Sequence, residues 1–454
     1  ACIEMNKTLR DSMKPDIRGF DYAVQILDMG VKPKVPFGNC GHYADLALAA
    51  MRSEGIPVVK DYIPIWSFRT LGHEWNAVLD TEGRWVEFGG ALSEPGVEEK
   101  IGERKSKVLR RTYAHNPRVL ELLASGEYVP VSFRSPFFTD VTASYIPCTD
   151  VEVEAAGEED GYVYIALSDW TGWRPIEFAR MEDGKATFRD IGTNSIYTVV
   201  RYDRYGAQRV VTPPFRLNRK GEKHYIIPDE SRLRTVTLNR KFPVLPSVTS
   251  AAVRINGAEL HAADNPDFRN YRLIHKVADG FATAHEVKVA DTIGAHRYWR
   301  YKQDIPGTYC NVAELKFIDA DNREMSGRII GTPGAYKEVP YATKEKAFDS
   351  DPLTIFEAPT DAGGWVGMDF GEPVRVAAIE FTGRGDGNAI ERGDLYELFY
   401  FKDGAWRSLG QKTGEGVTVT FDNVPENALL LLRDRTKGKD ERIFTYENGE
   451  QIWW

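Results

Sequence analysis

The sequence predicts a multidomain protein in which an α+β domain is followed by β-sandwich domains. Apolar residues at helical spacing are concentrated before about residue 140. Beyond that point short alternating strands dominate, separated by Gly, Asp and Asn turns, which is typical of β-sandwiches. A length of 454 residues fits roughly two to four domains.

The front domain, residues 1–138, mixes helices and strands. We expect two short helices within 5–29, separated near Pro15, and a third over 42–53 that ends before Gly55 and Pro57. The remaining expected elements are strands at 58–65, 74–79 and 85–88, a turn at 80–83, and helical segments at 98–113 and 117–124.

Three β-rich blocks follow. Residues 139–232 have the pattern of short strands and turns that is typical of an immunoglobulin-like sandwich. Residues 233–318 and 319–454 are two further β-rich blocks, separated by a polar segment. The clearest expected strands are 151–155, 162–167, 186–189, 195–202, 298–302, 313–318, 365–369, 374–382, 396–401, 406–409 and 428–433.

Composition excludes several functional classes. No run of about 18 apolar residues is present, so we expect no membrane span. The chain has 58 basic and 67 acidic residues and no basic stripe, which argues against a nucleic-acid partner. The four cysteines form no CxxC pair, which excludes a zinc knuckle or a redox motif. We interpret Cys2, Cys148 and Cys310 as structural.

Cys40 is the candidate nucleophile. It lies between a glycine-containing turn and the predicted helix, in Gly38-Asn39-Cys40-Gly41. The positive end of the helix dipole favours a thiolate there, and unpaired backbone N–H groups of the first turn suit an oxyanion.

His73 is the candidate general base because it begins a strand that follows the Cys40 helix. If Leu79 pairs with Trp85 in the predicted hairpin, Ala77 pairs with Glu87, and Glu87 shares a face with His73. An acid on that face would orient the imidazole.

These motifs resemble the transglutaminase-like superfamily over roughly residues 1–135. The resemblance rests on Gly-Asn-Cys40-Gly-His-Tyr-Ala-Asp, Arg52-Ser-Glu-Gly-Ile-Pro57, Gly-His73-Glu-Trp-Asn and Trp85-Val-Glu-Phe. It implies a papain-like core with a Cys-His-Asp triad, in a family that includes transglutaminases, cysteine proteases and a deglycosylating amidase.

One position departs from this pattern, since Gly89 stands where the family has Asp. Either Glu87 substitutes, or a backbone carbonyl or Asn76 orients the imidazole, or the site is impaired. Trp66 and Trp75 either wall a substrate groove or pack beneath the sheet.

The last block resembles the discoidin (coagulation-factor type C) domain, through the stretches 346–354, 364–371 and 374–384, and 233–318 resembles a degraded second copy. This resemblance implies carbohydrate or lipid-head-group binding. It also implies a structural calcium ion on Asp349, Asp351 and Thr354, for which a solvated turn is the alternative.

Together these features predict a cysteine hydrolase or acyltransferase that acts on peptide or carboxamide bonds of a protein, peptide or glycoprotein. No catalytic cofactor or catalytic metal is expected. Adhesion-type domains suggest a periplasmic or cell-surface location. The alternative is an inactive papain-like scaffold in a carbohydrate- or protein-binding protein. A glycoside hydrolase is disfavoured because we can place no acidic pair at the required separation.

Overall fold

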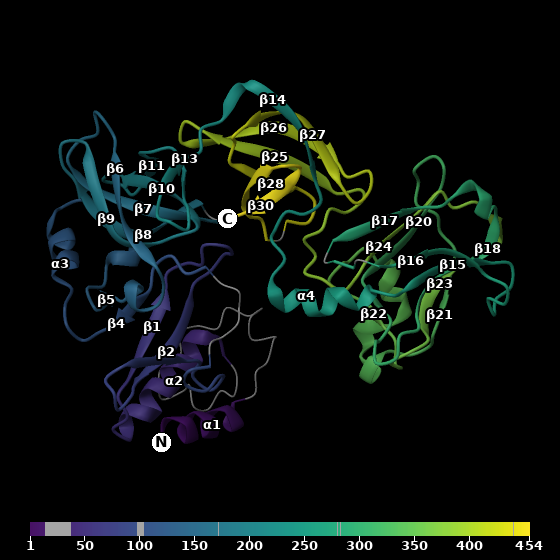
Figure 1. Cartoon of the computed structure of the whole chain (residues 1–454), viewed down its shortest axis with the longest axis horizontal. Coiled ribbons are helices and arrows are strands. Elements are labelled where there is room, and N and C mark those ends of the chain that lie inside the picture. The colour runs from purple at the N-terminus through teal and green to yellow at the C-terminus, as the bar shows by residue number, and fades with distance from the viewer. Residues whose placement is uncertain (14–37, 98–103, 171, 279, 282, 439) are drawn as a thin grey trace. The chain divides into compact units, whose positions relative to one another are not determined.

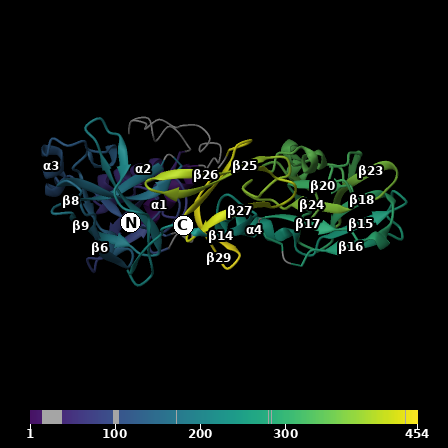
Figure 2. The same cartoon turned by 90° about the horizontal axis from the view of Figure 1, so that it is seen from above.

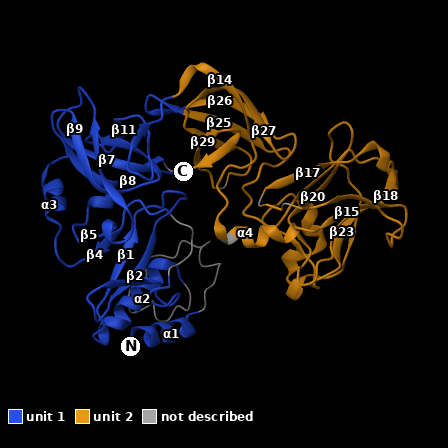
Figure 3. Cartoon of the chain, viewed as in Figure 1, with its two compact units in different colours: residues 1–227, 401–406, 454 blue, residues 228–400, 407–453 orange. Residues whose placement is uncertain are grey.

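The structure is a computed structural model that describes residues 1–13, 38–97, 104–170, 172–278, 280–281, 283–438 and 440–454. The chain forms two compact units (Figure 3). Unit 1 comprises residues 1–227 with 401–406 and 454, and unit 2 comprises 228–400 and 407–453.

Unit 1 begins with helices against an antiparallel sheet (Figure 1). Its helices are α1 (Cys2–Ser12), α2 (Cys40–Ser53) and α3 (Pro117–Ala124). The sheet has the order β3-β2-β1-β4-β5, with β1 (Val58–Ile63), β2 (His73–Leu79), β3 (Trp85–Phe88), β4 (Leu109–Arg111) and β5 (Phe138–Asp140). Helix α2 buries Ala47 and Met51 against Val58 and Val78 of the sheet. Helix α1 lies beside α2 (Figure 2).

The predicted hairpin has the register that the sequence indicates, because Leu79 pairs with Trp85 and Ala77 with Glu87. Helix α3 spans the expected residues 117–124. The helical expectation for 98–113 is wrong over its described residues 104–113, which contain no helix, and 109–111 form strand β4. There, pairing of Arg110 with Asp61 of β1 overrides the local helix preference. Residues 98–103, and the second helix expected within 5–29, lie outside the described residues.

The remainder of unit 1 is a β-sandwich. Its strands are β6 (Cys148–Glu154), β7 (Gly161–Asp169), β8 (Gly172–Met181), β9 (Lys185–Gly192), β10 (Ser195–Tyr202), β11 (Gln208–Val210), β12 (Phe215–Leu217) and β13 (Lys223–Tyr225). The pair β6-β9 faces the sheet β13-β12-β10-β7-β8 across a core that includes Val153, Ile165 and Phe188.

Unit 2 contains an eight-stranded sandwich. One sheet has the order β16-β15-β18-β23-β21 and the other β17-β24-β20. The strands are β15 (Glu259–Ala263), β16 (Arg272–Lys276), β17 (Ala284–Lys288), β18 (His296–Gln303), β20 (Glu314–Ile318), β21 (Arg328–Gly331), β23 (Gly364–Val374) and β24 (Ala378–Thr382). Strands β18 and β23 pair although they lie on opposite sides of the expected 318/319 boundary. The two expected blocks therefore share one sandwich.

The second sandwich of unit 2 pairs β14 (Asp229–Leu238) and β27 (Val419–Glu426) and packs them on the sheet β26-β25-β28-β29-β30. That sheet comprises β25 (Leu395–Lys402), β26 (Ala405–Thr413), β28 (Leu430–Asp434), β29 (Ile443–Glu447) and β30 (Glu450–Trp453), of which residues 401–406 are counted with unit 1. The short pair β19 (Asn311–Val312) and β22 (Phe356–Glu357) completes the strands of unit 2.

Helices are scarce in the β-rich part. Among the described residues after 145, the α-helical content is α4 (Pro246–Ala252), which has seven residues. Within the described part of the chain, no helix combines the length and the apolar character needed to cross a membrane.

Candidate active site

Cys40 is the first residue of helix α2. The Asn39 side chain caps the helix by accepting a hydrogen bond from the His42 backbone N–H at 3.1 Å. Such a cap stabilises a helix by about 1 kcal/mol. The backbone N–H groups of Cys40 and Gly41 belong to the first turn, where a helix offers no internal acceptor. Negative charge on the Cys40 sulfur or on a nearby oxyanion is favoured there.

The Cys40 thiol contacts the strand that begins with His73. Burial raises the pKa of this thiol, but a hydrogen bond with the His73 side chain, the charge of that imidazole and the Glu74 backbone N–H outweigh burial, so the pKa falls below its usual value. A lowered thiol pKa increases the fraction of thiolate, which is the nucleophilic form.

The other three cysteines lie in opposite environments. Burial raises the pKa of Cys2 and of Cys310. Burial and the neighbouring Asp190 carboxylate raise the pKa of Cys148 to about 11. Cys40 is therefore the cysteine whose surroundings favour a thiolate, and all four cysteines lie in described residues.

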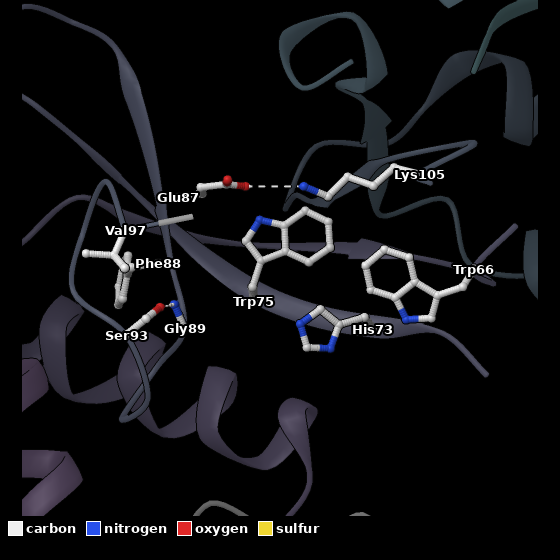
Figure 4. A pocket seen from close by; sticks show the side chains of 9 residues that line it. All are labelled: Trp66, His73, Trp75, Glu87, Phe88, Gly89, Ser93, Val97 and Lys105. Carbon is white, nitrogen blue, oxygen red and sulfur yellow. Dashed lines mark hydrogen bonds and ion pairs between the residues drawn. The ribbon is translucent and has the colours of Figure 1, made fainter. Parts of the chain in front are cut away.

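His73 reaches Cys40 because the chain before it runs close to β1. A Cβ atom on Gly72 would lie 2.5 Å from the Ile63 backbone oxygen, so a larger residue does not fit. The imidazole stacks near the indoles of Trp66 and Trp75, with ring centroids 5.6 and 5.8 Å away (Figure 4). Offset stacking of this kind restricts the plane of the imidazole.

A charged network joins helix α2 to strands β1 and β2 beside Cys40. Lys60 lies 2.6 Å from Asp45 of α2 and 3.2 Å from Glu74 of β2. The Glu74 carboxylate approaches Gly41 so closely that a Cβ atom there would lie 2.4 Å from its oxygen. These contacts hold the first turn of α2 against the start of β2.

The structure places Glu87 with a cation. The Glu87 carboxylate lies 3.6 Å from Lys105, and Figure 4 shows the pair above the Trp75 indole, away from the imidazole. Asn76 donates its amide to the backbone oxygens of Ala44 and Val59, at 3.0 and 3.3 Å. Neither contact is with the imidazole, so the assignment of the orienting group stays a prediction.

A small cavity marks the position of the missing acid. It has a volume of about 30 Å³, and its walls include His73, Glu87, Gly89, Ser93 and Lys105 (Figure 4). The Gly89 backbone N–H donates to the Ser93 hydroxyl at 2.7 Å. A volume of this size accommodates a water molecule.

His73 also lines a second, larger cleft, and Cys40 lies on that one. Its volume is about 390 Å³, and Cys40, Gly41 and His73 lie on its wall. Ser132 and Arg111 contribute polar groups to the same cleft. The thiol therefore lies on the wall of a cleft.

Trp66 and Trp75 are 1% and 5% exposed. Both indoles contact the imidazole, and contact with a substrate stays a prediction. His42, two residues after Cys40 in helix α2, is buried.

Comparison with known families agrees with this geometry. Residues 7–89 match the Transglutaminase-like superfamily, and residues 334–430 match the F5/8 type C domain. The protein carries a transglutaminase-like domain and a discoidin domain. None of the curated proteins compared with the chain matches it.

The two matches cover different parts of the structure. The transglutaminase-like match contains Cys40, His73 and the β1–β3 strands. The discoidin match begins within the eight-stranded sandwich and continues through β27 of the second sandwich.

Sequence reasoning did not find four residues of the network that reaches Trp75: Asp61, Lys105, Arg110 and Tyr145. Asp61 carries a usable signal, because it is a charged residue at a buried position of strand β1. Tyr145 carries none, since it lies far along the chain from Trp75 and its contact depends on the tertiary fold.

The expected calcium ligands lie together in an exposed turn of unit 2. Thr354 donates its hydroxyl to Asp349, at 3.0 and 2.9 Å to the two carboxylate oxygens, and Lys346 lies 2.9 Å from the same carboxylate. Asp351 accepts from the Leu353 backbone N–H. Among the described residues, no group of three or more His, Cys, Asp or Glu side chains is arranged to hold a metal. A calcium ion at this turn stays a prediction.

Proposed function

We propose that the transglutaminase-like domain is a cysteine hydrolase or acyltransferase that acts on peptide or carboxamide bonds of a protein or glycoprotein. The observation that carries this proposal is the Cys40 thiol at the start of helix α2, hydrogen-bonded to His73 on the wall of a cleft. The lowered pKa of Cys40, set against the raised pKa of Cys2, Cys148 and Cys310, supports the same assignment.

The first step forms an acyl-enzyme. The Cys40 thiolate attacks the carbonyl carbon, and the backbone N–H groups at the start of α2 stabilise the oxyanion. His73, as imidazolium, gives its proton to the departing amine, and the carbon–nitrogen bond breaks to leave a thioester on Cys40.

The second step decides the reaction class. If water attacks the thioester, His73 accepts its proton and a carboxylic acid leaves. If a primary amine attacks instead, a new amide forms. Both routes regenerate the Cys40–His73 pair, and the same residues serve both.

The discoidin domain supports delivery of this site to a protein or glycan surface, which is the class of ligand that such domains bind. A periplasmic or cell-surface location fits that role. The composition of the chain argues against a nucleic-acid partner.

Alkylation and activity assays test the proposal. Iodoacetamide should label Cys40 at pH 6, and peptide mass spectrometry should find Cys148 unlabelled there. Hydrolysis of fluorescein-labelled casein and incorporation of a biotinylated primary amine into casein then separate the two reaction classes. Cys40→Ala should abolish either activity and Cys148→Ala should preserve it. Labelling of Cys40 only above about pH 8 would contradict the proposal.

An inactive scaffold is the second candidate. It is favoured because Gly89 has no carboxylate and the nearby Glu87 pairs with Lys105. A reactive Cys40 that transfers no acyl group from any protein substrate would favour this candidate.

A further inference from the structure

A buried carboxylate lies beside the candidate active site. Asp61, at the middle of strand β1, has no exposed surface. It accepts two hydrogen bonds from Arg110, both at 2.8 Å, and a third from the Tyr145 hydroxyl at 2.5 Å. A buried charge is tolerated when it is paired and fully hydrogen-bonded, as Asp61 is.

Tyr145 connects this carboxylate to Trp75. The Trp75 indole N–H donates to the Tyr145 hydroxyl oxygen at 3.2 Å, and the Tyr145 hydroxyl donates to Asp61. Burial and the Asp61 charge raise the pKa of Tyr145 far above its usual value, so the phenol keeps its proton. The direction of both hydrogen bonds is therefore fixed: Trp75 donates to Tyr145, and Tyr145 donates to Asp61.

Trp75 is held at its edge and presents its face to the imidazole. Its ring meets the Tyr145 ring edge-on, with centroids 5.5 Å apart and planes at 82°. The planes of Trp75 and His73 differ by only 23°, and those of Trp66 and His73 by 27°. The orientation of the Trp75 indole thus sets the surface on which the imidazole lies.

Charged groups surround this arrangement. The Lys105 ammonium lies 5.4 Å from the centroids of both the Trp75 and the Tyr145 rings, and its carboxylate partner is Glu87. The Arg69 guanidinium lies 5.1 Å from the centroid of the Trp66 ring, which also stacks on the imidazole.

We propose that Asp61 and Tyr145 are positioning residues, which fix Trp75 and through it hold the His73 imidazole against Cys40. The inference rests on the proposed function of the Cys40–His73 pair. It accounts for an imidazole held in place although Gly89 supplies no acid side chain. Tyr145 lies outside the transglutaminase-like match at residues 7–89, so this support comes from a different part of the chain.

The test measures the pH dependence of Cys40 alkylation by iodoacetamide in the full-length chain. Tyr145→Phe keeps the ring and removes the hydroxyl that joins Trp75 to Asp61. If the imidazole loses its orientation, the hydrogen bond to Cys40 weakens and the thiol pKa rises. We expect alkylation at pH 6 to slow about three- to tenfold, since one pKa unit corresponds to tenfold in thiolate.

Trp75→Phe provides the second variant, because it keeps an aromatic face but lacks the indole N–H. It should slow alkylation similarly, and adding Tyr145→Phe to it should slow the reaction no further. Tyr197→Phe is the matched control, since Tyr197 is a buried tyrosine of unit 1 whose hydroxyl donates to the Gly192 oxygen at 2.6 Å. It should leave the pH profile of Cys40 unchanged.

The outcomes separate the two proposals. If wild-type Cys40 is unreactive at pH 6, the proposed function fails. If wild-type Cys40 reacts but a folded Tyr145→Phe protein has the wild-type profile, the positioning role is overturned. If Tyr145→Phe does not fold, an unchanged pH profile of Cys40 alkylation in Trp75→Phe overturns the positioning role instead. The role is also overturned if the double variant slows alkylation by the product of the two single effects.

Discussion

Cys40 and Cys148 are two partly exposed thiols of the same unit, and their neighbours give them opposite chemistry. Cys40 opens a helix and contacts an imidazole, and its pKa is lowered. Cys148 opens strand β6 and donates its thiol proton to the Asp190 carboxylate at 3.4 Å, and its pKa rises to about 11. The sign of the neighbouring charge, more than the exposure of the thiol, separates a candidate nucleophile from an inert cysteine.

The largest expected difference between the two thiols concerns activity. Cys40→Ala should reduce acyl transfer or hydrolysis at least about a thousandfold, because no other group can form the thioester. Cys148→Ala should keep wild-type turnover. Thermal melts should show Cys40→Ala within a few degrees of wild type, since the residue lies at a cleft. If Cys40→Ala keeps its activity, or lowers the melting temperature by much more than a few degrees, Cys40 is not the nucleophile but a structural residue.

The next difference depends on His73. His73→Gln keeps a polar side chain but removes the imidazole charge that lowers the pKa of Cys40. A lowered pKa places the thiolate at lower pH, so its loss shifts the alkylation profile to higher pH. We expect alkylation at pH 6 to fall at least about tenfold, with Cys148 labelling unaffected. An unshifted profile would show that the helix terminus alone sets the reactivity.

The two thiols should also make the free energy of unfolding depend on pH in opposite directions. Because the folded state lowers the pKa of Cys40, this thiol stabilises the fold fully above its ordinary pKa of about 9, and the contribution disappears as pH falls through the folded value. Cys148 contributes fully below about pH 9, and its contribution disappears as pH rises through about 11.

A third comparison concerns the acid of the site. Glu87→Gln removes a carboxylate whose observed partner is Lys105, so we expect turnover within about twofold of wild type. Gly89→Asp places a carboxylate at the wall of the small cavity beside His73 and should raise turnover up to about tenfold. Both variants are compared on one acyl substrate. A loss of several orders of magnitude in Glu87→Gln would instead make Glu87 the orienting acid.

The features that sequence predicted here are local. The Cys40 helix follows from apolar spacing with Gly55 and Pro57 behind it, and the Leu79–Trp85 register follows from a short turn between alternating strands. Both depend on residues close together in the chain.

The features that sequence missed depend on distant contacts. Strands β18 and β23 share a sheet although a polar break separates their blocks, and no local pattern specifies that pairing. Likewise Glu87 reaches Lys105, and Trp75 reaches Tyr145, only through the tertiary fold. A register argument places Glu87 on the correct face but cannot say which cation it meets.

The smallest expected effect is on Cys148. Asp190 has a positive φ of 51°, a conformation that Asn adopts readily, so Asp190→Asn should fold without backbone strain. The substitution removes the negative charge that opposes ionisation of Cys148, and the thiol pKa should move from about 11 toward the value that burial alone imposes. Alkylation of Cys148 at pH 9 should then rise about fivefold, while Cys40 keeps its profile.

Asp150→Asn is the matched control, because Asp150 accepts from the Asp190 backbone N–H at 3.0 Å. If both variants leave Cys148 unchanged, burial and not the Asp190 charge keeps this thiol inert, and the contrast with Cys40 rests on the imidazole alone.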